Sequence, residues 1–449
     1  TDENGKLDYV AIKVPNVTEN TLADIVEPDV EKLIFYEYNN DPNNWDEANA
    51  LAISKGGRIP TAQEMVDWLA INGRIIDAMM WAPVYNSNIA SPYKDWVQVG
   101  LADGTNGTPN YGHFTGKLLS VAVPNDPDYL SSGTVNQNVS YNDYYFWVIE
   151  IQPVEIDSDY KYLAFPYSGG SEDQTEYSVT FDEPDGTECD ILIVGGGGAG
   201  GTEYIGCGGG AGGLVYDDSN ITLSGTYDIL VGRGGVAVSA GNEENGFSSK
   251  FSQSGSTLYE GYGGGNGGTY YSPDGAVGGS SGGTTWTGGR THDNNQALIN
   301  HPLANASKGT PLSLSYGNKG SIYYSVSGKF YSGGGGGSGS NGYREAGKYG
   351  WGGDGKLINI TGQNVYYAGG GGGGSDWAGY AASGGSGIGG NGASGNENPN
   401  IGPTSGNPNT GSGGGGGGGG AGGAAGDGGG DGGSGIVIIR YKTTKGSFT

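Results

Sequence analysis

The residues CDILIVGGGGAGG at positions 189–201 decide the fold of this chain. A short apolar run ends there in glycines, and glycine runs recur at 333–337, 369–374 and 413–420 before a second apolar run, SGIVIIRY, at 434–441. A free glycine run is a flexible coil, because glycine loses more backbone entropy on ordering than any other residue. Strand-like segments that bracket the whole region argue against a linker. We therefore expect a folded glycine-rich domain whose first and last strands pair.

Large aromatic side chains lie between the glycine runs, and flexible linkers rarely contain them. If the runs are ordered, they can form polyproline-II-like helices with three residues per turn and amides bonded to neighbouring helices. The aromatic residues then either cap the edges of this bundle or stack on sugar rings, as in adhesins. The ligand-binding candidates are Trp286, Trp351, Trp377 and Tyr380.

The two end motifs, DILIVGGGGAGG at 190–201 and GIVIIRY at 435–441, resemble those of a glycine-rich domain of viral and marine microbial surface proteins. The plan is similar to the glycine-rich region of the anaplastic lymphoma kinase ectodomain and to the glycine-rich tips of T-even phage fibres. The resemblance covers about residues 158–443. It implies an all-β sandwich with inserted polyglycine-II helices.

Glycine content divides the chain. Residues 1–153 hold 10 of the 97 glycines, so a boundary lies near residue 153 and the glycine-rich domain spans 154–449. Residues 1–27 are an N-terminal arm or a first strand, and 28–153 form a separate domain. The net charge of −26 repels nucleic acid phosphates and anionic membranes. Because of this charge, we expect no nucleic acid binding. No apolar run approaches 18 residues, so we also expect no membrane insertion.

Residues 28–153 predict an α+β domain. Strand patterns cover 31–38, 95–101 and 145–151, and a helix pattern covers 45–55. Thr61 followed by Glu64 forms a capping box for a second helix.

This order resembles the C-type lectin-like fold. The resemblance rests on Trp45, Ala48, Ala52, Gly56, Ile59 and Glu64, on WVQVGL at 96–101 and on FWVIE at 146–150. Ala52 stands where the family usually has a disulfide cysteine, so such a domain is disulfide-free here. Sugar-binding members hold Ca²⁺ with carboxylate and amide oxygens.

The matching positions for Ca²⁺ are Asn125, Asp126, Asn142 and Asp143, although Val123 replaces the family's glutamate. Alternatively, these residues form a turn and a strand start.

Two further motifs allow alternatives. Cys189 and Cys207 either form a disulfide, which would stabilise the fold by about 3 kcal/mol, or remain buried thiols. Residues 195–200 match the G-x-G-x-x-G fingerprint of dinucleotide sites, but the following TEYIGCG at 202–208 cannot begin the required helix.

The chain lacks a convincing paired-carboxylate motif for glycan hydrolysis, so we expect a non-enzymatic protein. An adhesin-like or fibre-like protein on a virion surface or outside the cell fits best, with a host-surface glycan or protein as receptor. The alternative is a self-associating subunit of an extracellular filament or capsid decoration, which contacts other virion or filament proteins and has no ligand of its own.

Overall fold

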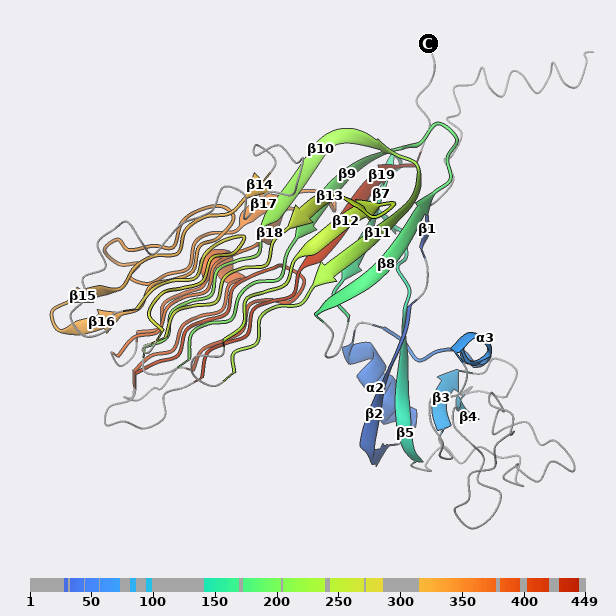
Figure 1. Ribbon diagram of the computed structural model, residues 1–449, viewed down its shortest axis with the longest axis horizontal. Helices are drawn as coiled ribbons and strands as arrows, with labels where there is room; N and C mark the ends of the chain where they lie inside the picture. Colours follow the sequence, from blue (N-terminus) through green and yellow to red (C-terminus); the bar gives the residue numbers. More distant parts are fainter. Residues whose placement is uncertain are drawn as a thin grey trace, which may run out of the picture. The chain divides into compact units, whose positions relative to one another are not determined.

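The computed structural model describes residues 28–30, 33–43, 45–55, 57–72, 81–85, 94–98, 141–168, 173–202, 205–238, 243–269, 272–285, 315–376, 380–395, 402–419 and 428–443. It divides into two compact units (Figure 1). The N-terminal unit is Glu31–Ile151. The glycine-rich unit begins at Gln152 and includes the strand β1 (Asp29–Val30), which precedes the N-terminal unit in the chain. Asp29 and Val30, expected in the 28–153 domain, therefore belong to the other unit.

The described residues of the N-terminal unit form two helices and two antiparallel strand pairs. Its elements are β2 (Leu33–Asn43), α2 (Trp45–Ser54), α3 (Ala62–Asn72), β3 (Trp81–Tyr85), β4 (Lys94–Gln98) and β5 (Tyr141–Ile149). β2 pairs with β5, and β3 pairs with β4. The predicted capping box is confirmed at the start of α3. The Thr61 N–H donates to Glu64 Oε2 over 2.8 Å, and the Glu64 N–H donates to Thr61 Oγ1 over 3.2 Å.

Apolar side chains from both helices and both strand pairs form the core of this unit. Met65 of α3 is fully buried against Val84 of β3 and Phe146 of β5. Trp68 meets the Phe146 ring edge to face, with centroids 5.4 Å apart, an arrangement that aromatic pairs favour. The Trp45 indole N–H donates to the Val84 carbonyl oxygen over 2.9 Å, so α2 is fixed to β3.

Most of the described strands of the glycine-rich unit form two large sheets, and the other described strands form two separate hairpins. The five-stranded sheet has the order β1, β8 (Gln174–Phe181), β11 (Gly225–Gly232), β12 (Ser249–Gln253) and β13 (Ser256–Gly261). The six-stranded sheet has the order β14 (Ser315–Tyr316), β10 (Leu214–Leu223), β9 (Thr187–Val194), β19 (Ile436–Lys442), β7 (Tyr160–Pro166) and β6 (Val154–Glu155). Every second side chain of β8 is buried, the pattern of a strand with one face on a core. Tyr177 of β8 meets Phe165 of β7 edge to face at 5.4 Å, which joins the two sheets.

The expected pairing of the first and last strands around the glycine runs is confirmed. β19 lies between β9 and β7 and is antiparallel to both. Val437 of β19 is opposite Ile193 of β9, and Arg440 is opposite Asp190. The Arg440 Nε–H donates to Asp190 Oδ2 over 2.8 Å, while the Asp190 side chain is only 3% exposed. The two ends of a region about 250 residues long are therefore joined by β-sheet hydrogen bonds and an ion pair.

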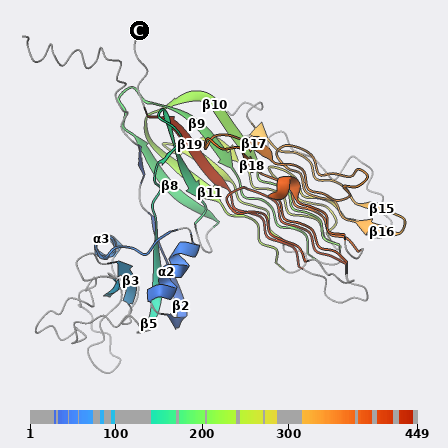
Figure 2. The ribbon, with the colours of Figure 1, turned by 180° about the vertical axis from the view of Figure 1, so that it is seen from behind.

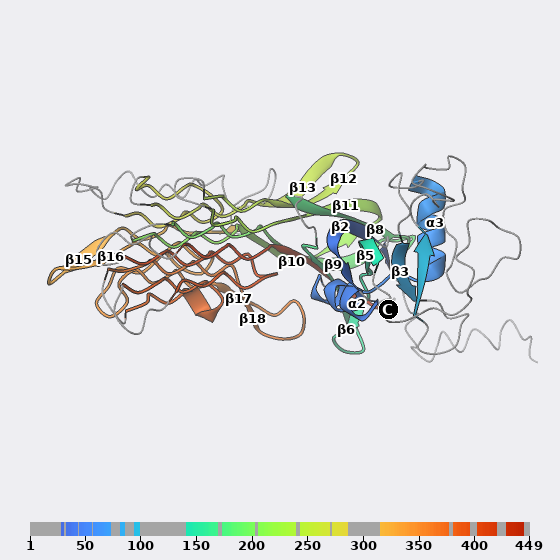
Figure 3. The same cartoon turned by 90° about the horizontal axis from the view of Figure 1, so that it is seen from below.

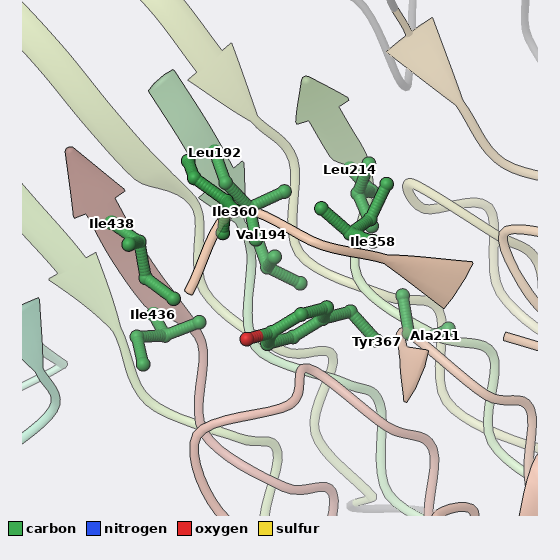
Figure 4. Packing of buried hydrophobic residues seen from close by; sticks show 10 residues of the cluster. Leu192, Val194, Ala211, Leu214, Ile358, Ile360, Tyr367, Ile436 and Ile438 are labelled. Carbon is green, nitrogen blue, oxygen red and sulfur yellow. The ribbon is translucent and has the colours of Figure 1, made fainter. Parts of the chain in front are cut away.

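A third layer covers the outer face of the six-stranded sheet. It is the hairpin of β17 (Lys356–Ile358) and β18 (Val365–Tyr367), which places Ile358, Ile360 and Tyr367 against the sheet (Figure 4). Leu192 and Ile438 are among the sheet residues that they contact. Because both faces are covered, six consecutive residues of β9 are buried, which accounts for the unbroken apolar run in the sequence.

The glycine-rich segments extend side by side from the strand ends (Figures 1 and 3). Residues 206–213 lie among them, and their N–H groups turn to three neighbours in strict rotation, over 2.7–3.0 Å. Residues 206, 209 and 212 donate to segment 411–417, residues 207, 210 and 213 to segment 262–268, and residues 208 and 211 to segment 333–336. Their carbonyl groups rotate in the same way toward segments 195–201, 280–283 and 371–374. Segment 206–213 is thus held by backbone hydrogen bonds to six others.

This packing leaves no room for side chains at most positions. A Cβ added to Gly209 would lie 2.1 Å from the Gly198 carbonyl oxygen, and one added to Gly208 would lie 2.0 Å from that of Gly371. Ala211 is accommodated because it joins the apolar cluster of Leu214. The glycine runs are required for close approach of backbones, not for flexibility.

Candidate ligand site in the glycine-rich unit

A depression of about 410 Å³ opens where the ordered glycine segments give way to side chains. It is lined by Tyr343, Lys348, Trp351, Asp354, Ser383, Ser386 and Asn391 together with glycines 352, 384, 385 and 387. One wall is the short helix η2 (Gly385–Gly387), which lies on the face of the segments seen in Figure 2. The volume falls in the range of small-molecule sites, roughly 300–1,000 Å³.

Two aromatic rings and one cation share the depression. The Lys348 ammonium lies 4.3 Å from the centroid of the Tyr343 ring and 5.8 Å from that of Trp351. Such contacts are cation–π interactions, worth about 0.5–1 kcal/mol at exposed sites. The site therefore combines apolar ring faces with a positive charge.

A hydrogen-bond network fixes Asp354 and Tyr343. The Tyr343 hydroxyl donates to Asp354 Oδ2, and the Ser386 hydroxyl donates to Asp354 Oδ1 over 3.3 Å. The Asp354 N–H donates to Ser340 Oγ over 2.9 Å. The hydrogen bond to Asp354 raises the pKa of Tyr343, because it stabilises the protonated phenol. The Tyr343 ring is therefore held in place as a neutral group.

Asn391 supplies an amide to the same depression. Its Oδ1 accepts a hydrogen bond from the Gly384 N–H over 3.0 Å, and its backbone N–H donates to Thr404 Oγ1 over 2.8 Å. These contacts orient the side chain, which is itself exposed. The Nδ2 amide then supplies hydrogen-bond donors for a ligand.

An aromatic cluster supports the site. It connects to the hairpin of β15 (Tyr324–Val326) and β16 (Lys329–Tyr331), at the end of the glycine-rich segments farthest from the sandwich (Figure 1). Tyr349 stacks on Tyr324 with centroids 4.6 Å apart and contacts Tyr331 at 5.2 Å. Tyr331 in turn meets Tyr380 edge to face at 4.8 Å. The cluster fixes the chain between Tyr343 and Trp351.

Two of the four aromatic candidates lie in this region. Trp351 lines the depression, whereas the Tyr380 hydroxyl donates to the Tyr349 carbonyl oxygen over 2.9 Å and thus serves the supporting cluster. Trp286 and Trp377 lie outside the described residues. Sequence reasoning missed Tyr343, Lys348, Asp354 and Asn391. The aromatic and basic stretch YREAGKYGW at 343–351 could have indicated Tyr343 and Lys348, whereas Asp354 and Asn391 lie outside it.

The calcium candidates are not brought together by the described residues. Asn125 and Asp126 lie outside them, and Asn142 and Asp143 lie in the first part of β5, where only the backbone is described. Within the described part of the chain, no group of three His, Cys, Asp or Glu side chains could hold a metal ion. The Ca²⁺ site stays a prediction.

The two cysteines are separate buried thiols, the second of the alternatives left open by the sequence. Cys189 lies in β9, and Cys207 lies in the segment 206–213. Burial raises the pKa of the Cys207 thiol to about 12 and raises that of Cys189 as well. The G-x-G-x-x-G motif at 195–200 leads into extended segments at 195–202 and 205–213, not into the helix of a dinucleotide site.

Comparison with known proteins identifies one region. A family model described as a glycine-rich domain matches residues 173–442, more than half of the chain. A search of curated proteins finds no significant match. Neither α2 nor α3, the α-helices of the described residues, is long and apolar enough to cross a membrane.

Proposed function

This chain belongs to the family of glycine-rich domains, and from that premise we propose that it is a non-enzymatic, receptor-binding surface protein. The glycine-rich unit is the scaffold, and the depression beside Trp351 is the site that it displays. An adhesin-like or fibre-like role on a virion surface or outside the cell fits this division between scaffold and site. The receptor is a host-surface glycan or protein.

The scaffold consists of polyglycine-II helices in this proposal. The rotation of hydrogen-bond partners every three residues supports it, because a polyproline-II-type helix has three residues per turn and no internal hydrogen bonds. The six neighbours of segment 206–213 support it as well. A bundle of such rods resists bending, since every rod is bonded to its neighbours along its length.

The N-terminal unit is a C-type lectin-like domain in the same proposal. Its first long strand pairs with its last, and both helices lie between them in the chain. This arrangement agrees with the resemblance seen in the sequence. The unit adds a second surface that could contact a receptor.

The observation that carries the receptor-binding role is the combination of ring faces and hydrogen-bonding groups in one depression. Trp351 and Tyr343 offer rings, while Asn391 and Lys348 offer donors. Sugars present both C–H faces, which stack on aromatic rings, and hydroxyl groups, which need polar partners. A purely structural role would not require these aromatic and polar side chains to lie together.

Glycan-array and host-cell binding by the full chain test the proposal. We expect Trp351→Ala to weaken binding at least about tenfold, which corresponds to about 1.4 kcal/mol. Tyr366→Ala is the matched control, because Tyr366 is 42% exposed on β18 and does not line the depression. Equal binding by all three proteins would count against the site. Light scattering adds a second discrimination: self-assembly without binding would favour the filament or capsid-decoration subunit.

A further inference from the structure

We infer that the depression binds an acidic saccharide, a sugar ring that carries a carboxylate or a sulfate. The inference rests on the proposed function and names the ligand class of its site. The first observation is a local reversal of charge. Residues 315–376 hold five basic and three acidic side chains, a net charge of +2, whereas the rest of the chain carries −28. This stretch runs from β14 through the β15–β16 hairpin past β18 and includes Lys348, and its positive balance favours anions over the acidic remainder of the chain.

The second observation is the position of Lys348. Its ammonium lies over the rings of Tyr343 and Trp351, and the nearest carboxylate contact, to Glu345 Oε1, measures 3.9 Å. Glu345 is 65% exposed, and a surface pair of this kind contributes little. An anionic ligand would replace these weak contacts by a charge-assisted hydrogen bond. As the ammonium turns toward the anion, it uncovers the ring faces for the sugar.

Among the described residues, Asp354 is the one carboxylate that lines the depression, and neighbouring hydroxyl groups engage its oxygens. Its Oδ2 accepts the Tyr343 hydroxyl, and its Oδ1 accepts the Ser386 hydroxyl. The carboxylate thus serves to hold the Tyr343 ring. The cation of the site, in contrast, is held only by its weaker contacts with Tyr343, Trp351 and Glu345 within the described residues.

Neutral parts of the sugar have partners too. The Nδ2 amide of Asn391 can donate to a hydroxyl group, because Oδ1 already accepts from Gly384. The Ser383 side chain lines the same wall. In this proposal Lys348 binds the anionic group and Trp351 binds the sugar ring. Each contact can be removed by mutation without the other.

Calorimetric titration of the full chain tests the inference with four probes: glucuronic acid, galactose 6-sulfate, glucose and galactose. We expect at least one acidic sugar to bind about tenfold more tightly than its neutral counterpart, and the preference to shrink as salt is added. Lys348→Gln should remove this preference. Lys356→Gln is the matched control, because it removes the same charge where the Lys356 ammonium lies 4.3 Å from the Tyr316 ring, outside the depression.

The outcomes separate this inference from the proposed function. A preference for glucuronic acid alone or for the sulfated sugar alone supports the inference and identifies the anion. Equal affinity for acidic and neutral sugars overturns it, and if Trp351→Ala still weakens binding, the receptor-binding role stands. Equal losses of the acidic-sugar preference in Lys348→Gln and Lys356→Gln also overturn it. The preference would then come from the overall charge of the protein and not from the depression. Absence of binding to any sugar overturns it and removes the glycan form of the proposed function.

Discussion

The two halves of the glycine-rich unit are ordered by opposite means. In the sandwich, strands bury apolar side chains such as Leu192, Phe165 and Ile438, and the backbone pairs with neighbouring strands of the same sheet. In segments such as 206–213, side chains are nearly absent and the backbone itself pairs with six neighbours. The first arrangement gains from the hydrophobic effect. The second gives each N–H group of segment 206–213 a hydrogen-bond partner, which offsets part of the large entropy cost of ordering glycine.

The two halves are therefore sensitive to opposite kinds of substitution. A sandwich core loses stability when atoms are removed, because cavities form. The glycine segments lose stability when atoms are added, because carbonyl oxygens of neighbouring segments occupy the space where a Cβ would stand. The added atom should have the larger effect, since a core can relax around a cavity whereas packed backbones cannot move aside.

Gly209→Ala should produce the largest loss. Its Cβ would lie 2.1 Å from the Gly198 carbonyl oxygen and 2.6 Å from that of Ala199, and both obstacles are backbone atoms that cannot rotate away. We expect a loss of more than about 4 kcal/mol in unfolding free energy, or failure to fold, since overlaps of this kind are among the most severe substitutions. Denaturant unfolding followed by tryptophan fluorescence measures it, with amide exchange of residues 206–213 as a local readout.

Gly402→Ala is the matched control, because no atom lies within 4 Å of a Cβ built there. It should change stability by less than about 0.5 kcal/mol. If both variants were equally stable, the close packing of segment 206–213 would be refuted. Equal destabilisation would point instead to a general loss on replacing glycine.

The sequence predicted the strands that bracket the glycine runs better than it predicted long-range partners. The apolar runs at 190–194 and 436–439 identified β9 and β19 and their pairing, because a buried strand must be apolar on both faces. Thr61 and Glu64 identified the start of α3, because a capping box is local. The membership of Asp29 and Val30 in the five-stranded sheet was not predictable, since their partner β8 is about 150 residues away.

Ile438→Ala tests the other half of the comparison. Ile438 is 1% exposed and packs in the cluster that includes Leu192 and Ile360. Removal of its side-chain carbons should cost about 3 kcal/mol, the usual size for Ile→Ala in a core. Leu357 on β17 is 45% exposed, so Leu357→Ala should cost less than about 1 kcal/mol. A larger loss for Ile438→Ala than for Gly209→Ala would reverse the expected order of the two halves.

The candidate site was predictable only in part. Trp351 stood out because large aromatic residues are rare in glycine-rich sequence. Lys348 and Tyr343 lie in the same stretch and were open to the same argument. Asn391 lies 40 residues later, and only the folding of segment 383–391 beside residues 351–354 brings it to the depression. Contacts of this kind follow from the register of glycine segments, which a run of identical residues does not encode.

Cys207 sharpens the comparison because it is a side chain inside the segment 206–213. The thiol is fully buried, and its pKa is raised to about 12, whereas an unfolded thiol ionises near pH 8.5. Below pH 8.5 both states are protonated, and the stability is unchanged. Between pH 8.5 and about 12 the unfolded state releases the proton while the folded state keeps it, so stability falls as pH rises.

At pH 10 this loss should reach about 2 kcal/mol relative to pH 7, and Cys207→Ala should lack it. Chemical unfolding of both proteins at pH 7, 9 and 10 measures the difference. Cys189 is present in both, so its own raised pKa cancels in the comparison. Parallel pH profiles would mean that the thiol reaches water in the folded protein. Segment 206–213 would then admit solvent around a side chain, unlike the sandwich core, where burial is expected to hold across the same pH range.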